Sequence, residues 1–343
     1  MVVIFATIFF ISKNAFSFES IVNQHGIWIV RHNLKSKASI DRVIANLENL
    51  KIEHAYLQIR GRGYTYYNSQ IEPKAPGIDK NFDPLHYFIE SALEKNIKVH
   101  AWINTYLLWT NRSDPTNNNH LYFKHPDWFE VNRKSQNDNS VRQIYLSPHV
   151  MRVNLYLLSI VEEVIDRYRV DGIHLDYVRY YNENSGYHPV GLQDFQKIKN
   201  DEKDSFDHTD EWIEYKSRKV DELILDISEL IKIQSRQICF SAAVKPNPFR
   251  AYYSYGQNWV KWLNSNWIDH VVLMNYADNV QVFTENLSLV QMDCEIDKVF
   301  CGIGLWNKPK EIIVDQLIES KKMGFHKFVL FSYDTVINNN WIH

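Results

Sequence analysis

Short apolar runs alternate with amphipathic stretches along the chain after Phe18. Eight runs rich in apolar and β-branched residues predict strands at 26–31, 54–60, 97–103, 171–176, 237–243, 270–275, 298–303 and 327–332. A helical period predicts helices at 39–50, 83–96, 147–168, 210–233, 259–263 and 309–323. Ser39 is the expected cap of the first helix, and Asp83 with Pro84 is expected to begin the second. This alternation, without a Pro/Gly/Ser-rich linker, predicts an α/β fold, a single (β/α)8 TIM barrel over residues 18–343 with long loops after strands three and four.

Polar residues occupy one face of three neighbouring predicted strands. Side chains alternate between the two faces of a strand, and in a barrel one face meets the helices while the other meets the axis. The set expected to face the axis is Tyr56, Gln58, Arg60, His100, Trp102, Asn104, Gly172, His174 and Asp176. Arg60, Asn104 and Asp176 stand at the carboxyl ends of their strands, where barrel enzymes carry their active sites. The alternative is a hydrogen-bonded polar layer that only specifies packing of the core.

The first residues have a different character. Residues 2–11 form an unbroken apolar run that is too short to cross a bilayer as a helix. Ala15-Phe-Ser17 follows shortly after, and small residues at this spacing are typical of a cleavage site before Phe18. We therefore expect residues 1–17 to be a signal peptide and the mature chain to have no membrane span. The protein is then exported, to the periplasm, the cell surface or the medium.

Composition narrows the expected partners. The net charge is −3, with 38 basic and 41 acidic residues and no long run of one sign, so nucleic acid is not an expected partner. Aromatic residues make up 14% of the chain, which suits a cleft for sugar rings as well as an aromatic core. The three cysteines, at positions 239, 294 and 301, have neither a disulfide framework nor the spacing of a zinc site.

Several segments resemble, in order, the bacterial glycosyl-hydrolase-like family 10. The best matches are Val99-His-Ala-Trp-Ile-Asn104 and Val170-Asp-Gly-Ile-His-Leu-Asp-Tyr-Val-Arg-Tyr180, preceded by Tyr145-Leu-Ser-Pro148. Shorter matches are Gly26-Ile-Trp28, Leu57-Gln-Ile-Arg60, Phe82-Asp-Pro-Leu85, His125-Pro-Asp-Trp128, Gly302-Ile-Gly304 and Phe331-Ser-Tyr333. The resemblance implies a (β/α)8 barrel of exported glycosidases, and better understood members are associated with peptidoglycan glycan strands. The polysaccharide expected here includes such strands in their peptide-free form.

Hydrolysis of a glycosidic bond generally needs two carboxyl groups that flank the bond. Asp176 is the first expected catalytic residue, because it faces the axis at a strand end within the best-matched motif. By analogy with related barrels it is the nucleophile, with general acid or base as the alternative. Asp278, after the sixth strand, is the first choice for the second carboxyl group, ahead of Asp334 and Glu130. Asp171, at the opposite end of its strand, is expected to be structural.

The residues expected to bind substrate surround these carboxyl groups. Arg60 and Arg179 are candidates for binding a sugar hydroxyl or an acidic substituent through charge-assisted hydrogen bonds. His100 and His174 either bond to Asp176 and adjust its pKa or are satisfied core histidines. Stacking platforms are expected among Trp102, Trp109 and Trp128. The expected set also includes Asn104, Asn275 and Tyr276.

Two other functions remain open. Tyr177 stands where the family often has a second carboxylate, which favours a catalytically inactive barrel that only binds glycan. A metal-dependent hydrolase would use His100, His174 and Asp176 as ligands, although neither an HxxH nor an HExxH spacing is present. The main hypothesis needs neither a metal nor a cofactor. A chitinase-type arrangement is excluded at the fourth strand, because Val178 cannot donate a proton.

Overall fold

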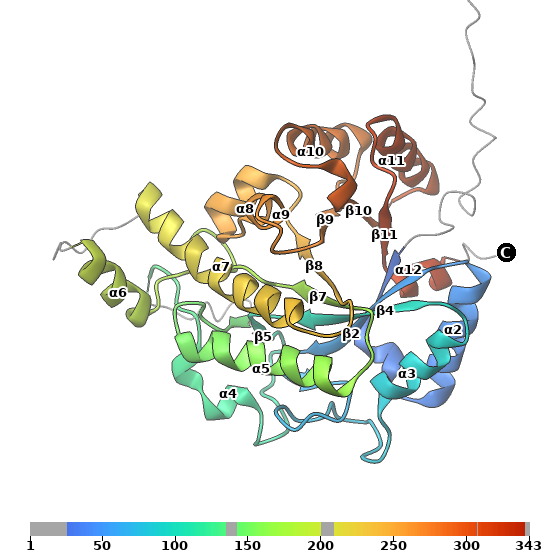
Figure 1. The fold of residues 1–343 in the computed structure, drawn as a ribbon, viewed down its shortest axis with the longest axis horizontal. Helices are drawn as coiled ribbons and strands as arrows, with labels where there is room; N and C mark the ends of the chain where they lie inside the picture. The colour runs from blue at the N-terminus through green and yellow to red at the C-terminus, as the bar shows by residue number, and fades with distance from the viewer. Residues whose placement is uncertain (1–25, 135–142, 200–208, 307, 340–343) are drawn as a thin grey trace, which may run out of the picture.

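A closed barrel of parallel strands forms the centre of the protein (Figure 1). The structure is a computed structural model that describes residues 26–134, 143–199, 209–306 and 308–339. β1 pairs with both β2 and β11, and these two pairings close the sheet. The eight barrel strands are β1 (Gly26–Ile29), β2 (His54–Gly61), β4 (Lys98–Asn104), β7 (Gly172–Asp176), β8 (Cys239–Val244), β9 (His270–Asn275), β10 (Val299–Gly304) and β11 (Phe328–Phe331). The predicted (β/α)8 barrel is confirmed.

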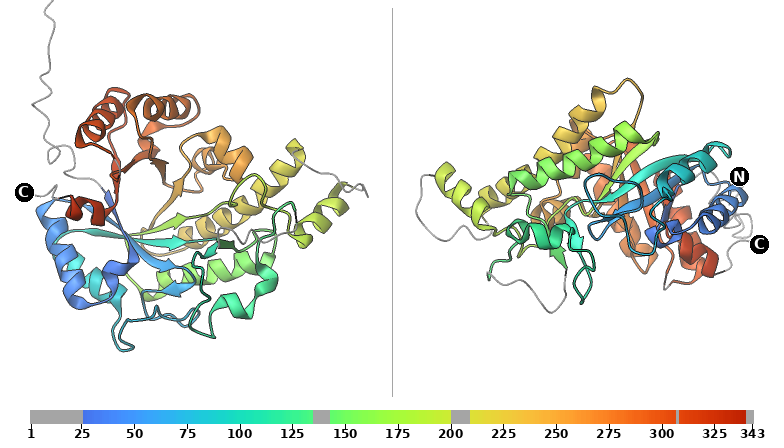
Figure 2. Two further views of the ribbon diagram at one scale, coloured as in Figure 1. Left: turned by 180° about the vertical axis from the view of Figure 1, so that it is seen from behind. Right: turned by 90° about the horizontal axis from the view of Figure 1, so that it is seen from below.

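Helices cover the outside of the barrel, as the views in Figures 1 and 2 show. They include α2 (Lys37–Asn49), α3 (Pro84–Leu93), α5 (Met151–Arg167), α7 (Asp210–Lys232), α10 (Val280–Asp293) and α11 (Lys310–Lys322). Further helices are α6 (Pro189–Lys199), α8 (Pro248–Tyr255), α9 (Trp259–Asn264) and α12 (Tyr333–Asn338). Sequence patterns did not predict α6, α8, α10 or α12. Asp83 caps α3 as expected, but Ser36, not Ser39, accepts the capping hydrogen bond of α2.

The barrel has two apolar layers. One lies between strands and helices, and the other fills the barrel itself with large rings at the level of Trp28, Tyr56 and Trp102. Along β10, Gly302 makes room for this filling, since a Cβ atom there would lie 2.8 Å from the Trp28 ring. The interior is therefore a packed core whose upper end, at the carboxyl ends of the strands, is available for a site.

Two long loops rise from β4 and β7, as predicted. The first carries the small sheet of β5 (Leu107–Trp109) and β6 (Ile144–Tyr145). Between these two strands lie α4 (Leu121–Lys124) and the 3-10 helix η3 (Pro126–Trp128), and α5 follows β6. The second carries α6. Backbone hydrogen bonds join them: Arg133 N–H donates to Asn184 and Tyr187 N–H donates to Val131. The loops therefore support each other beside the barrel mouth.

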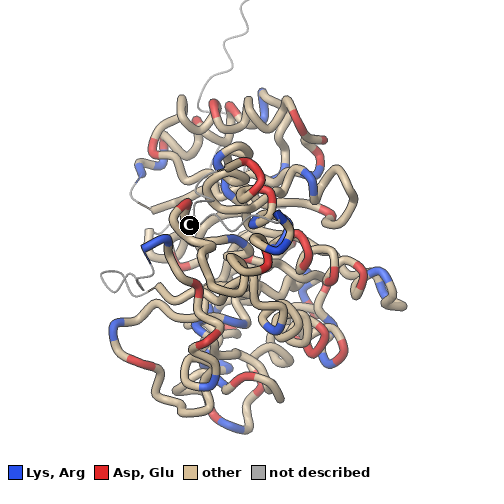
Figure 3. Tube along the Cα trace, turned by 90° about the vertical axis from the view of Figure 1, so that its left-hand side faces the viewer, with Lys and Arg blue, Asp and Glu red and all other residues tan. Residues whose placement is uncertain are grey.

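The remaining expectations about the whole chain have different outcomes. The predicted signal peptide, residues 1–17, lies outside the described residues. Within the described ranges no helix combines the length and the apolar character needed to span a membrane. Cys239, Cys294 and Cys301 are free thiols. Basic and acidic residues are interspersed along the trace in Figure 3.

Candidate active site

Asp176 ends β7 at the barrel mouth and is held on both carboxylate oxygens. The Trp102 indole N–H donates to Oδ2 over 3.2 Å, and the Tyr177 backbone N–H donates to Oδ1 over 2.7 Å. Tyr177 has φ of 55°, which is unusual for a residue with a side chain, and this turn brings its N–H back onto the carboxylate. Asp176 is 7% exposed, and Asn104 lies opposite it in the β4–β7 register.

Opposing effects set the charge of Asp176. Burial raises its pKa to about 6, because a carboxylate loses hydration in the barrel mouth. The positive charge of Arg179, the two hydrogen bonds and the charge of Lys245 act in the opposite direction. The group is therefore mostly ionised at neutral pH and can take up a proton under mildly acidic conditions.

The positive charges of Arg179 and Lys245 act on Asp176. In the described part of the chain neither residue forms an ion pair with another carboxylate. The Arg179 guanidinium lies 5.2 Å from the Tyr177 ring centroid and 5.3 Å from that of Tyr255. Its Nε is buried and has no hydrogen-bond partner in this part of the chain. Lys245 directly follows β8, and burial together with Arg179 lowers its pKa to about 8. Sequence reasoning missed Lys245, although a cation directly after a strand is a usable signal.

The two histidines predicted beside Asp176, His100 and His174, belong to the core instead. His174 Nε2 accepts from the Trp28 indole N–H over 3.1 Å, and its Nδ1 lies 2.9 Å from Ser241 Oγ. Because an indole can only donate, His174 is neutral, with its proton on Nδ1. His100 bonds to His54 over 2.9 Å and stacks on Tyr56. Among the described residues no three His, Cys, Asp or Glu side chains converge as a metal site would require.

Arg60 does not face the barrel axis, and this part of the prediction is wrong. A bulge in β2 places Gln58 beside Trp102 but Arg60 beside Ile103, so the alternation slips by one residue. The Arg60 side chain is fully buried and forms a bidentate ion pair with Glu72, with N–O distances of 2.6 and 2.8 Å. It also donates to the carbonyls of Asn104 and Thr105. Gln58 takes the place at the axis.

Asn275 and Tyr276 lie on different sides of the barrel wall. Asn275 faces α10, where its amide N–H donates to Phe283 and its oxygen accepts from Asn286. The expectation that it faces the substrate is therefore wrong, because β9 turns His270 and Val272 inward and Asn275 outward. Tyr276 packs against Phe331 and Trp306 at the mouth. Burial, and to a smaller extent the charge of Asp176, raises the pKa of the Tyr276 phenol.

The candidates for a second carboxyl group differ in their surroundings. Asp278 is exposed after β9, and its charge acts on Lys308. Asp334 pairs with His32 over 2.9 Å. Glu130 accepts from the backbone N–H groups of Val131 and Gly186, and burial raises its pKa to about 7. Asp171 accepts from Val99 N–H, the structural role expected for it. None of these carboxyl groups shares a hydrogen-bond partner with Asp176 in the described part of the chain.

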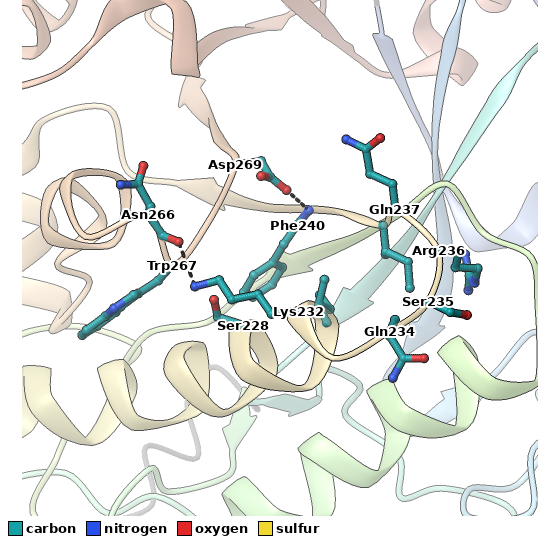
Figure 4. A pocket seen from close by; sticks show the side chains of 12 residues that line it. Ser228, Lys232, Gln234, Ser235, Arg236, Gln237, Phe240, Asn266, Trp267 and Asp269 are labelled. Carbon is teal, nitrogen blue, oxygen red and sulfur yellow. Dashed lines mark hydrogen bonds between the residues drawn. The ribbon is translucent and has the colours of Figure 1, made fainter.

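A separate hollow of about 340 Å³ lies at the other end of the barrel, around the start of β8 (Figure 4). Two of its charged side chains bond to the backbone: Asp269 accepts from the Phe240 N–H, and Lys232 donates to the Asn266 carbonyl. Arg236 donates to three carbonyls around the end of α5. This face therefore contributes to stability, and the mouth at Asp176 is the better candidate for chemistry.

Two known proteins with sequences similar to this chain carry the name glycosyl hydrolase. "Glycosyl hydrolase YngK" of Bacillus subtilis is 24% identical over 60% of this chain and 39% of its own length. "Glycosyl hydrolase DigH" of Escherichia coli is 28% identical over 46% of this chain and 37% of its own length. The chain thus spans about two fifths of the length of these relatives. The glycoside hydrolase domain of PgaB (BpsB) from Bordetella bronchiseptica has a similar fold, with a TM-score of 0.71, 16% identity, and coverage of 92% of this chain and 96% of the domain.

The family itself follows from a match over most of the chain. The model of the family described as Glycosyl hydrolase-like 10 covers residues 23–301, which contain the strands from β1 to β9 and the site at Asp176. This protein therefore belongs to the glycosyl hydrolase-like 10 family.

Proposed function

We propose that the protein is a glycosidase that cleaves O-glycosidic bonds of a polysaccharide at the barrel mouth, with Asp176 as an essential carboxyl group. The observation that carries the proposal is the arrangement of Asp176 itself. It is buried at a strand end, oriented by Trp102 and Tyr177, and flanked by cations and aromatic rings. Membership of the family and the printed names of the relatives support the same activity.

Asp176 acts as the nucleophile in this proposal. A nucleophilic carboxylate must be ionised and fixed in direction, and a donor on each oxygen meets both needs. Asp278 remains the proposed second carboxyl group, because it is exposed beyond the end of β9, two strands away from β7, whereas Glu130 and Asp334 are already bonded. If Asp176 instead transfers the proton, its raised pKa serves that role.

Peptide-free peptidoglycan glycan strands are the proposed substrate, and export is the proposed location. The resemblance to family members associated with such strands supports the first. The apolar run and cleavage pattern in residues 1–17 support the second, since export brings the enzyme to the compartment of the cell wall.

Product release from peptide-free strands and from a panel of polysaccharides tests the activity. We compare the wild type with Asp176→Asn, and with Asp194→Asn as a control that removes a carboxylate from the surface of α6. We expect fragments from the wild type and the control only. Equal cleavage by Asp176→Asn would remove Asp176 from the mechanism.

Azide distinguishes the two roles of Asp176. In Asp176→Ala, added azide can displace the leaving group where the missing carboxylate would have attacked. A glycosyl azide of inverted anomeric configuration indicates a missing nucleophile. An azide product with the configuration of the substrate indicates a missing acid/base group, because the intact nucleophile then forms the intermediate first.

A glycan-binding barrel without catalysis is the second candidate. One observation favours it: Tyr177 follows Asp176 where the family often has a carboxylate. Calorimetric titration with oligosaccharides tests it. Binding that persists in both wild type and Asp176→Asn, with no product from either, would establish this function.

A further inference from the structure

A second hollow, of about 270 Å³, opens on the β1–β2 side of the mouth. Its lining includes Arg31, Arg62, Tyr64, Tyr66 and Trp109, and its volume is close to the lower end of the roughly 300–1,000 Å³ typical of small-molecule sites. We name it the basic aromatic pocket. The three aromatic side chains are each less than a tenth exposed, so they form a fixed wall.

The charges of this pocket are unbalanced. Arg31 and Arg62 both line the pocket, and burial together with the charge of Arg31 lowers the pKa of Arg62. Within the described ranges neither arginine has a carboxylate partner, and Lys35 adds a third positive charge to the lining. The lining also contains the carboxylate of Asp114, which accepts from the Tyr122 hydroxyl over 3.0 Å. An anion placed between the guanidinium groups would relieve their repulsion.

The chain holds Arg62 in this position at a conformational cost. Arg62 has φ of 56°, in the left-handed region that residues with a side chain seldom adopt, and Gly63 continues the turn with φ of 63°. The Arg62 carbonyl oxygen lies 2.7 Å from His120 Nε2. The Nε of Arg62 donates to the Thr110 hydroxyl over 2.6 Å. Only part of the guanidinium fork is thereby used, because no described group binds its two terminal nitrogens.

Hydrogen bonds connect the pocket with the surroundings of Asp176. Arg31 donates to the Gln58 side-chain oxygen over 2.8 Å, and Gln58 donates to Asn104 over 3.1 Å. Asn104 lies beside Asp176 in the β4–β7 register. The charge of Arg31 also acts on the phenol of Tyr177, the residue that follows Asp176. A chain of hydrogen-bonded side chains therefore leads from the pocket to the strand position beside the proposed catalytic carboxylate.

We propose that the basic aromatic pocket is a subsite for a carboxylate-bearing sugar unit, so that the substrate is an acidic glycan. Arg62 and Arg31 bind the carboxylate through charge-assisted hydrogen bonds, and the aromatic wall contacts the sugar ring. The neighbouring glycosidic bond lies toward Asp176. This inference rests on the proposed glycosidase function, because it treats the bound glycan as the substrate. Binding to the pocket can nevertheless be measured without cleavage.

Equilibrium binding in the Asp176→Asn background tests the subsite independently of catalysis. The probes are peptide-free glycan strands, whose muramic acid units carry carboxylates, and the same strands with those carboxyl groups reduced to alcohols. Oligomers of a hexuronic acid distinguish a general carboxylate site from one shaped for the lactyl ether. Arg62→Gln is the test variant, and Arg42→Gln, on the exposed face of α2, is the matched control.

Arg62→Gln should weaken binding of at least one carboxylate-bearing probe by about tenfold or more and leave binding of the reduced strands unchanged. Arg42→Gln should change neither, and unchanged thermal unfolding verifies that both variants are folded. Equal effects of Arg62→Gln on charged and reduced strands, or no binding of any charged probe, would overturn the proposal. Selective binding without cleavage by the wild type would refute the glycosidase function alone. Equal cleavage by the wild type of strands with carboxylates and of the reduced strands would refute the subsite alone.

Discussion

Removing the indole donor of Trp102 should raise the pKa of Asp176. Trp102→Phe keeps an aromatic ring in the barrel but deletes the N–H that reaches Asp176 Oδ2 over 3.2 Å. This length is at the upper end for an N–H···O bond, so we take the lower end of the about 1.5–3 kcal/mol contributed by a hydrogen bond to a charged group. At about 1.4 kcal/mol per pKa unit, the pKa should rise by about one unit. Burial sets the starting value at about 6, so the variant should have a pKa of about 7.

The pH dependence of kcat/KM measures this shift, because its limbs report ionisations of the free enzyme. If Asp176 is the nucleophile, the acidic limb moves up by about one unit and activity near pH 6 falls several-fold while the alkaline plateau is kept. If Asp176 is the proton donor, the alkaline limb moves up instead. Trp262→Phe is the control, since that buried indole donates to Asp221 rather than to Asp176. A folded Trp102→Phe enzyme with both limbs unmoved would refute the reasoning.

Three further variants test other parts of the structure. Arg60→Met should lower the free energy of unfolding by about 3–5 kcal/mol in a denaturant titration, because it leaves Glu72 charged and buried; a loss below about 1 kcal/mol would contradict this. Lys245→Met should raise the pH limb assigned to Asp176 by less than one unit, since it removes one of several favourable charges; a downward shift would reverse the assigned sign. The pKa of Glu130 is raised to about 7 in the fold, so its contribution to stability is present at low pH and is lost as the pH rises through 7. Between about pH 5 and pH 8 the free energy of unfolding of the wild type should therefore fall by on the order of 1–3 kcal/mol because of Glu130, and Glu130→Gln should remove this fall. Thermal unfolding across this pH range measures it, and the same pH dependence in wild type and variant would contradict the reasoning.

The strands were predictable because their signal is local. Each barrel strand is a run of apolar and β-branched residues that lies between helices, and only its ends were uncertain by a residue or two. The alternation rule also placed Trp102, Asn104 and Asp176 correctly toward the axis. Helices α6 and α8 are short, with 11 and 8 residues, so few turns repeat their apolar positions, and in α10 the apolar residues are scattered among polar ones.

The failures within the site have geometric causes. A bulge shifts the alternation of β2 and sends Arg60 outward, and no residue between Gln58 and Arg60 signals it. Partners distant in sequence decide the rest: His174 meets Trp28 and Ser241, so it serves the core and not Asp176. For Arg31, Arg62 and Lys245 a signal existed, since each lies at or just after the carboxyl end of a barrel strand.

The charges around Asp176 explain why one carboxyl group can be both buried and ionised. Burial alone favours the protonated form, whereas a nucleophile must lose its proton. Two hydrogen bonds and the charges of Arg179 and Lys245 counter the burial and leave the pKa at about 6. The same cations, with Arg31 and Arg62 on the other side of the mouth, make this region positive in a chain whose net charge is −3. An acidic glycan would therefore be attracted to the region in which Asp176 is kept ionised.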